Sequence, residues 1–361
     1  MKNLLSKSKL GAYEIPNRII MAPLTRGRAD ENGNATEIMT QYYEQRADAG
    51  LIISEATSIS VQGSGWIYAP GVYTEQQVAA WKQVTQAIHK KGGRIFLQLW
   101  HMGRVSHPDF QEGASLPVAP SPIAAQGESR TPKGKKPYVV PRELSKSEMN
   151  RVVKDYVKAA VGAMTAGFDG VEVHGANGYL LDQFVRDASN QRTDDYGGSI
   201  AKRWRFPLEV VQALIEAIGA EKIGYRISPT GTYNSMSDRD PTSTFAYGAR
   251  ELANLGIAYL HVLEALPGNM FHNAEAPLVL PRIRKEFTGF LIANGGYTPE
   301  KAEKAILEQE VDAIAFGSLF LANPDFVQRV KRGVAEFNEV DFPTMYSTGK
   351  KGYTDYPYYS N

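Results

Sequence analysis

Residues 170–184, GVEVHGANGYLLDQF, indicate both the fold and the place of the functional site. The segment begins as a short apolar run of the kind that forms a buried strand. It then breaks into a glycine-rich turn that carries His174, Asn177 and Tyr179. An imidazole, an amide and a phenol at a strand end are typical of the face where a barrel enzyme presents its catalytic groups. The alternative is that His174 and Asn177 only cap the following turn.

The composition excludes several kinds of chemistry. The chain has 361 residues and no cysteine, so disulfides, Cys-ligated metal centres and thiol catalysis are excluded. The net charge is +1 and no basic block occurs, which argues against nucleic acid or an anionic membrane as a partner. No stretch approaches the roughly 18 apolar residues of a membrane span, and the N-terminus lacks the apolar core of a signal peptide. We therefore expect a cytoplasmic protein.

Short apolar segments alternate with amphipathic segments along the chain. The expected strands are Ile19 to Pro23, Leu51 to Glu55, Arg94 to Leu99, Gly170 to His174, Lys222 to Ile227, Ala258 to Leu263, Phe290 to Ala293 and Asp312 to Phe316. Each is followed by a predicted helix. Eight such repeats predict a single α/β domain over residues 1–361, a (β/α)8 TIM barrel. An open doubly wound sheet is the alternative, but no Gly-x-Gly-x-x-Gly follows the first strand.

The repeat is interrupted after the third strand. From Trp100 to Leu144 the sequence has no clear period and is rich in Pro, Gly and Ser. Loops of this length inside a compact domain are usually functional lids, so we expect an inserted flap at about residues 101–144. Its middle, Arg130 to Tyr138, can form a hairpin. A tolerated surface insertion is the alternative. The pattern resumes at Ser145, with Glu148 three residues later, as a capping box.

Polar side chains gather where the predicted strands end, which is where a barrel has its active site. No pair of carboxylates and no metal-ligand cluster stands out, so we expect no metal. Amide, guanidinium, imidazole, phenol and indole groups suit a flat heteroaromatic ligand instead. Glycines after the seventh and eighth strands are typical of a phosphate site. Flavin mononucleotide (FMN) fits both features, although Asn294-Gly295-Gly296 taken alone can be a simple turn.

Several ordered motifs carry a resemblance to a known family. They are MAPLTR from Met21, EAT from Glu55, QLWH from Gln98, HGANGYLL from His174, RTDDYGGS from Arg192, AFG from Ala315, ANPD from Ala322 and GYTDYP from Gly352. On these motifs, residues 17–357 resemble the old yellow enzyme family of FMN-dependent ene-reductases. The chain is particularly similar to the bacterial N-ethylmaleimide and nitrate-ester reductases.

The resemblance implies a tightly, non-covalently bound FMN that NADPH or NADH reduces. It places Gln98 at the pyrimidine amide of the flavin and Arg226 near its N1 and C2 carbonyl, where a fixed charge favours the anionic reduced flavin. Pro23, Leu24, Thr25 and Ala56 map to the redox-active edge, His174 and Asn177 also face the ring, and Asn294, Gly295, Gly296, Gly317 and Ser318 map to the phosphate loops. The family commonly has Arg where this chain has Ser318.

The implied reaction is reduction of the activated C=C bond of α,β-unsaturated carbonyl compounds, and of nitro compounds or nitrate esters. His174 and Asn177 would donate hydrogen bonds to the substrate carbonyl while hydride passes from FMN to the β-carbon. Tyr179 would then protonate the α-carbon. Trp66, Trp100 and Tyr353 would shape the substrate pocket, with ordinary packing at the barrel rim as the alternative.

Two other functions remain open at this point. One is a non-catalytic flavoprotein that senses redox state, against which the set of His174, Asn177 and Tyr179 argues. The other is a metal-free barrel lyase, which would need a Schiff-base lysine or an acid–base carboxylate at a strand end. The expected partners are small electrophilic alkenes, and we expect a monomer or a weak homo-oligomer.

Overall fold

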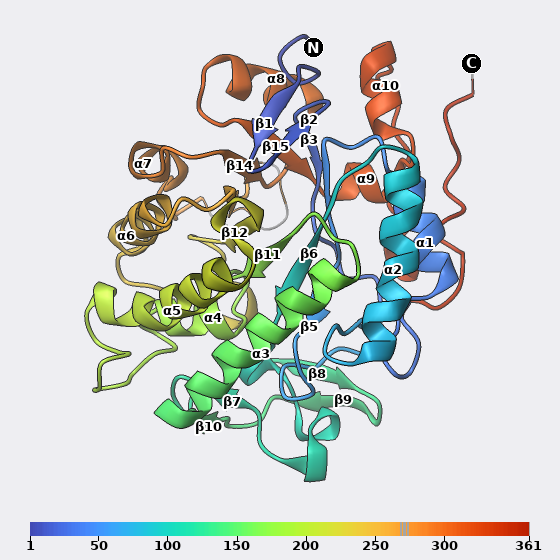
Figure 1. Ribbon diagram of the computed structural model, residues 1–361. Coiled ribbons are helices and arrows are strands. Elements are labelled where there is room, and N and C mark those ends of the chain that lie inside the picture. The colour runs from blue at the N-terminus through green and yellow to red at the C-terminus, as the bar shows by residue number, and fades with distance from the viewer. Residues whose placement is uncertain (268, 270–271, 273, 361) are drawn as a thin grey trace.

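The computed structural model shows a closed barrel of parallel strands and describes residues 1–267, 269, 272 and 274–360 (Figure 1). The barrel order is β11, β12, β13, β14, β15, β3, β4, β6, and the pairing of β6 with β11 closes it. All eight pairings are parallel. The strands are β3 (Ile19–Met21), β4 (Leu51–Ile53), β6 (Ile95–Trp100), β11 (Gly170–His174), β12 (Ile223–Ile227), β13 (Tyr259–Leu263), β14 (Leu291–Asn294) and β15 (Ala313–Phe316). The predicted (β/α)8 barrel is confirmed.

Helices surround the barrel and connect its strands (Figure 1). They are α1 (Glu37–Glu44), α2 (Glu75–Lys90), α3 (Lys146–Thr165), α5 (Ile200–Ile218), α6 (Pro241–Asn254), α7 (Leu280–Glu286), α8 (Pro299–Leu307) and α10 (Phe326–Arg332). The Ser145 side chain accepts a hydrogen bond from the backbone N–H of Glu148 and the reciprocal bond is also present, which confirms the capping box. Two short helices were not predicted, α4 (Leu180–Val185) and α9 (Ser318–Ala322).

The barrel interior contains a buried apolar cluster and a polar side. The apolar cluster takes side chains from around the barrel, including Ile20 of β3, Ile53 of β4, Phe96 of β6 and Tyr259 of β13. Buried polar residues project from five neighbouring strands, which form the polar side: Gln98 from β6, Glu172 and His174 from β11, Arg226 from β12, His261 from β13 and Asn294 from β14. Packing alone does not require polar groups in a barrel core, so the polar side is where a ligand is to be sought.

Two hairpins lie at opposite ends of the molecule (Figure 1). The unpredicted N-terminal pair β1 (Ser8–Leu10) and β2 (Tyr13–Ile15) lies where the barrel strands begin, since the Tyr13 hydroxyl donates to the carbonyl of Asp169 at 2.9 Å. The predicted flap hairpin is present as β8 (Glu128–Thr131) and β9 (Gly134–Pro137). It belongs to the segment that leaves the carboxyl end of β6, on the side of the candidate site.

Three further short strands support the rim of the barrel. β5 (Thr57–Ser58) pairs with the end of β6, so the second barrel strand is interrupted at residues 54–56. Within the flap segment, β7 (Val118–Ala119) pairs with β10 (Arg142–Glu143).

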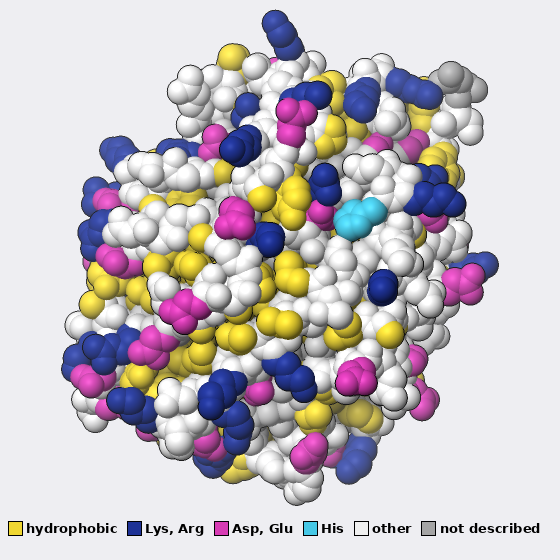
Figure 2. Space-filling view, viewed as in Figure 1, with side chains coloured by type: hydrophobic (Ala, Val, Ile, Leu, Met, Phe, Trp, Pro, Cys, Tyr) yellow, Lys and Arg dark blue, Asp and Glu magenta, His cyan; other side chains and the backbone are white. Residues whose placement is uncertain are grey.

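Acidic and basic side chains are interspersed over the face shown in Figure 2. No helix in the described part of the chain is long and apolar enough to cross a membrane.

Candidate functional site

His174, the last residue of β11, is an uncharged hydrogen-bond donor. Its Nδ1 accepts from the backbone N–H of Ala176 at 3.3 Å, which assigns the ring proton to Nε2. Burial lowers the pKa of His174 well below its usual value, and the nearby Arg226 and His261 lower it further. The Nε2–H group therefore stays available at neutral pH without carrying a positive charge.

Tyr179 lies between two aromatic rings. Its ring centroid is 4.7 Å from that of His174 and 5.0 Å from that of Trp100, both in edge-to-face geometry. Burial raises the pKa of Tyr179 well above its ordinary value, and neighbouring phenols add to the shift. The phenol thus keeps its proton at neutral pH and can act as an acid toward a sufficiently basic atom.

Asn177 adopts a left-handed backbone conformation, with φ of 58°. Asn tolerates this region better than most residues. Its backbone N–H donates to Ser228 Oγ at 2.8 Å, and its carbonyl accepts from Asn234 Nδ2 at 2.8 Å. Among the described residues its side-chain amide has no hydrogen-bond partner, so the amide is free to bind a ligand.

Hydrogen bonds to residues of α4 hold the turn that carries these groups. The Gly178 N–H donates to Asp182 Oδ2 at 2.8 Å, and Gln183 Nε2 donates to the Gly178 carbonyl at 2.7 Å. Arg186 Nε binds the other oxygen of Asp182 at 2.9 Å. Asp182, Gln183 and Arg186 are all buried. Such fully bonded buried networks fix geometry, so the turn is preorganised before any ligand binds.

Arg226 and Asn294 meet on the polar side of the barrel. Arg226 Nη2 donates to Asn294 Oδ1 at 3.3 Å, and Asn294 Nδ2 donates to the Ala315 carbonyl at 2.6 Å. Arg226 is also the register partner of His174 on the neighbouring strand. Its Nε is buried and has no partner within the described residues. A buried guanidinium N–H without an acceptor is costly, and a ligand acceptor would relieve that cost.

Residues that follow β3, β14 and β15 form a part of the site with little side-chain bulk. A Cβ atom at Gly317 would meet only Leu24 Cδ2, at 3.7 Å. Gly295 and Gly296 have φ values of 135° and 100°, which favour glycine. Ser318 begins α9 and is exposed. The open backbone at Gly317 allows close approach of a ligand such as a phosphate, whereas a Cβ atom at Gly295 would collide with the carbonyl oxygen of Glu264.

The remaining predicted ring contacts lie on neighbouring segments. Pro23 is buried and Thr25 is half-buried, both just after β3. Ala56 lies in the interruption between β4 and β5 and belongs to one apolar cluster with Trp100 and Tyr179. The structure therefore brings Ala56 to the catalytic candidates, as expected from its position at a strand end.

Three tyrosines at the site were not predicted from the sequence: Tyr138 after β9, Tyr233 after β12 and Tyr346 in the C-terminal segment. Each lies close enough to Tyr179 to raise the pKa of its phenol. Tyr346 also contacts Trp66 edge-to-face, at 5.1 Å between ring centroids. They come from irregular segments with no motif or period, so no signal in the sequence identified them.

Tyr353, which was predicted to line the substrate pocket, makes its contacts elsewhere. Its buried ring stacks on Tyr42 with 4.1 Å between centroids, and the guanidinium groups of Arg26 and Arg28 lie 5.0 and 4.7 Å from its centroid. A direct part for Tyr353 in substrate binding stays a prediction.

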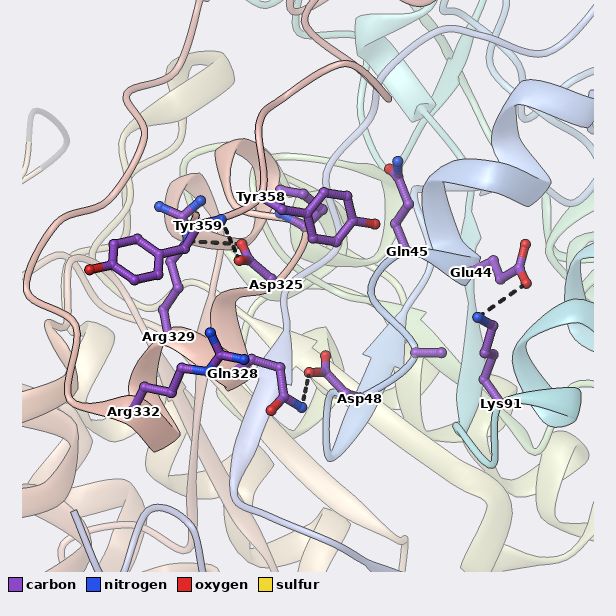
Figure 3. A pocket seen from close by; sticks show the side chains of 12 residues that line it. Glu44, Gln45, Asp48, Lys91, Asp325, Gln328, Arg329, Arg332, Tyr358 and Tyr359 are labelled. Atoms are coloured by element: carbon purple, nitrogen blue, oxygen red, sulfur yellow. Dashed lines mark hydrogen bonds and ion pairs between the residues drawn. The ribbon is translucent and has the colours of Figure 1, made fainter. Parts of the chain in front are cut away.

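The cavity drawn in Figure 3, of about 400 Å³, is a different feature. It lies between α1, α10 and the C-terminal tail and contains none of the predicted site residues. Its charges are largely paired, with Lys91 Nζ 3.7 Å from Glu44 Oε1 and Arg329 Nε 2.8 Å from Asp325 Oδ1 (Figure 3). We therefore place the candidate site at the barrel mouth.

The donor set at the barrel mouth fits FMN. The unpartnered Arg226 Nε would meet an acceptor of the flavin ring, and the opening at Gly317 leaves room for a phosphate beside the backbone. Within the described residues, no group of three or more His, Asp or Glu side chains is arranged to hold a metal ion.

Comparison with known proteins gives one consistent family. Residues 4–336 match the model of the NADH:flavin oxidoreductase / NADH oxidase family. The chain is 44% identical over 361 residues to a probable flavin mononucleotide-dependent alkene reductase of Leishmania infantum, covering 98% of this chain and 97% of that protein. It is 40% identical over 358 residues to 12-oxophytodienoate reductase 1 of Oryza sativa subsp. japonica, covering 98% of this chain and 93% of that protein.

Solved structures agree with these relatives. An old yellow enzyme homologue from Zymomonas mobilis superposes with a TM-score of 0.96 at 46% identity, covering 99% of each chain. Morphinone reductase in complex with tetrahydroNAD superposes with a TM-score of 0.94 at 43% identity, covering 100% of this chain and 99% of the other.

Proposed function

Because the chain belongs to the NADH:flavin oxidoreductase / NADH oxidase family, and within it to the old yellow enzymes, we propose that it reduces the activated C=C bond of α,β-unsaturated carbonyl compounds at the expense of NADPH or NADH. The observation that carries the proposal is the arrangement of Tyr179, His174 and Asn177. A protonated phenol, a neutral imidazole N–H and a free amide lie together at the mouth of an FMN-type barrel.

FMN would be held by residues from both sides of the barrel. When bound, it takes hydride from the reduced nicotinamide and passes it to an alkene. Gln98 and Arg226 would bind the pyrimidine end of the ring, and Pro23, Leu24, Thr25 and Ala56 its redox-active edge. Asn294, which the resemblance assigned to the phosphate loops, accepts a hydrogen bond from Arg226 Nη2 at 3.3 Å and would instead support the pyrimidine end. Gly295, Gly296, Gly317 and Ser318 would bind the phosphate. The orphaned Arg226 Nε supports this orientation, because it requires an acceptor at the polar side.

His174 and Asn177 would bind the substrate carbonyl oxygen. Negative charge grows on that oxygen as the β-carbon receives hydride, and donors fixed at such a position typically contribute roughly 3 kcal/mol each. A neutral His174 is suited to this task, since its Nε2–H donates without a proton having to be taken up first. The Asn177 backbone donates to Ser228 Oγ and accepts from Asn234 Nδ2, and these two bonds keep the residue in place.

Tyr179 would deliver the proton to the α-carbon. Its raised pKa keeps the phenol protonated at neutral pH, and an enolate carbon is basic enough to take that proton. Trp66, Trp100, Tyr138, Tyr233 and Tyr346 would form the aromatic wall around the alkene. The same donors would also bind the oxygen atoms of nitro compounds or nitrate esters.

An anaerobic turnover assay tests this proposal. We expect a yellow protein whose acid-released flavin is FMN, and one molecule of NADPH or NADH oxidised for each molecule of 2-cyclohexenone reduced to cyclohexanone. A bound FMN that neither nicotinamide reduces would indicate a non-catalytic flavoprotein instead. A protein that takes up no flavin even after reconstitution would favour the barrel lyase.

A further inference from the structure

A carboxylate lies buried in the barrel without a part in the reaction described above. Glu172, in the middle of β11, is 0% exposed. Burying a carboxylate is costly unless its oxygens are hydrogen-bonded, and a barrel core normally needs none. Both oxygens are used here: Gln98 Nε2 lies 2.8 Å from Oε1, and His261 Nδ1 lies 2.9 Å from Oε2.

The bond to Gln98 fixes the polarity of the Gln98 amide. An ionised carboxylate can only accept, so the NH2 group of Gln98 must face Glu172. The amide oxygen of Gln98 is then directed away from Glu172, and it has no hydrogen-bond partner within the described residues. Without Glu172, either end of the amide could point toward the ligand, because the two ends have nearly the same shape.

The position of the pair within the sheet supports this link to the site. Gln98 and Glu172 are register partners on β6 and β11, and His174 follows two residues later on the same face of β11. Arg226 is near enough for the Glu172 charge to raise its pKa, which burial lowers by a larger effect. The carboxylate therefore sits directly behind the groups assigned to the pyrimidine end of the flavin.

We propose that Glu172 is a positioning residue that orients Gln98 so that its amide oxygen, rather than its NH2 group, meets the flavin. The partner this oxygen selects is a hydrogen-bond donor, which in the flavin ring is the N3–H group. His261 holds the second carboxylate oxygen and so keeps Glu172 in place. This inference rests on the proposed function, because it requires Gln98 to face the pyrimidine ring of FMN.

The test compares FMN with N3-methyl-FMN, in which a methyl group replaces the N3 proton, so that the donor is lost and both ring carbonyls are kept. Apoprotein is titrated with each, and the ratio of dissociation constants is measured. Wild type is expected to bind FMN about tenfold more tightly, the effect of one buried hydrogen bond. Glu172→Met, which removes the acceptor for Gln98 at similar volume, should lower the ratio below about threefold.

Further variants show whether Glu172 acts through Gln98. Gln98→Met should lower the ratio equally, and adding Glu172→Met to it should change the ratio no further. The exchange variant Gln98→Glu with Glu172→Gln should restore the preference for FMN, since the residue 172 amide can donate to a carboxylate at 98 and still accept from His261. Tyr156→Phe is the matched control, because its hydroxyl is also buried without a hydrogen-bond partner among the described residues, and burial alone shifts its pKa.

The outcomes separate the two proposals. If wild type binds both flavins equally, or if Glu172→Met keeps the tenfold preference, the positioning role is wrong although the enzyme is still an FMN protein. If Glu172→Met does not fold, the exchange variant decides: equal binding of both flavins would overturn the inference. Failure of the wild-type apoprotein to bind either flavin would instead contradict the proposed function.

Discussion

The phenol of Tyr179 and the imidazole of His174 act at different atoms of the substrate in the proposed reaction, although their rings are 4.7 Å apart. His174 stabilises the oxygen, and Tyr179 supplies a proton to carbon. Only the second role requires a hydroxyl. The two half-reactions of the enzyme can therefore be separated by changes at single residues.

Tyr179→Phe should slow reoxidation of the reduced enzyme by 2-cyclohexenone strongly, because the proton donor is lost. Flavin reduction by NADPH should stay near wild type, since that step takes no proton from Tyr179. Both rates are measured by anaerobic stopped-flow absorbance, with general-acid loss expected to cost roughly 100-fold or more. Equal slowing of both half-reactions would mean that Tyr179 only packs the pocket.

Glu55 gives the protein a predictable pH dependence of stability. Burial raises its pKa to about 7, against a smaller opposing effect from the backbone N–H and charge of Arg26. Because the folded state holds this proton more tightly than the unfolded state, the stabilising contribution is full below the ordinary pKa of 4.5 and is lost as pH rises toward 7.

Glu55→Gln should remove this loss of stability at higher pH, because an amide does not titrate. Relative to wild type, the variant should gain roughly 3 kcal/mol of unfolding free energy between about pH 4.5 and pH 8, measured by denaturant unfolding. Glu148→Gln is a control of opposite sign, because hydrogen bonding to Arg142 lowers the pKa of Glu148 to about 2 and its contribution is lost on acidification. Parallel stability curves for wild type and Glu55→Gln would show that Glu55 does not titrate in this range.

At the level of elements, contacts of Asp109 with Thr131, Lys133 and Lys136 hold the flap hairpin, and we call this group the latch. Asp109 accepts a hydrogen bond from Thr131 Oγ1 at 2.7 Å, and its carboxylate lies 2.6 Å from Lys136 Nζ and 3.5 Å from Lys133 Nζ. The hairpin leads into Tyr138, which packs against the cluster that contains Tyr179. The latch therefore connects the outer flap to the wall of the site.

Asp109→Asn should loosen the hairpin and speed tryptic cleavage at Lys133 to Lys136 several-fold at neutral pH, as followed by mass spectrometry. The pKa of Asp109 is lowered to about 2, chiefly by its hydrogen bond to Lys136. The latch is therefore intact above pH 3.8, the ordinary pKa of an aspartate, and opens only as the pH falls toward 2. Glu112→Gln, in the same segment, is the matched control, since Glu112 forms no ion pair among the described residues. First cleavage elsewhere, at equal rates in all three proteins, would argue against a latch.

Across the whole molecule, the sequence predicted the barrel because its signal is repeated eight times. Apolar strands, amphipathic helices and the Ser145 cap are local features that the structure retains. The short helices α4 and α9 have six and five residues, too few to show a helical period, and the β1–β2 pair depends on contacts with distant loops. The sequence alone therefore did not predict these elements.

The residues of the site likewise include some that the sequence predicted and some that it did not. His174, Asn177 and Tyr179 lie together because one turn carries them, and strand ends bring Gln98 and Arg226 to the same face. Tyr346 reaches Trp66 from a segment that Arg28 holds through the carbonyls of Thr344 and Met345, and such long-range contacts leave no period in the sequence. The pairing of Glu172 with Gln98 likewise needs the register of two strands, which the sequence does not state.

Isotopic labelling of the product tests most directly whether this barrel transfers hydride and proton to opposite ends of an alkene. Reduction of 2-cyclohexenone with 4-deuterated NADPH, in protonated buffer, should place one deuterium on the β-carbon and none on the α-carbon, as read by NMR and mass spectrometry of the cyclohexanone. In heavy water with unlabelled NADPH, the deuterium should appear at the α-carbon, where Tyr179 delivers a solvent-derived proton. Deuterium from NADPH that is absent from the β-carbon, or no reduced product at all, would contradict the proposed ene-reductase activity.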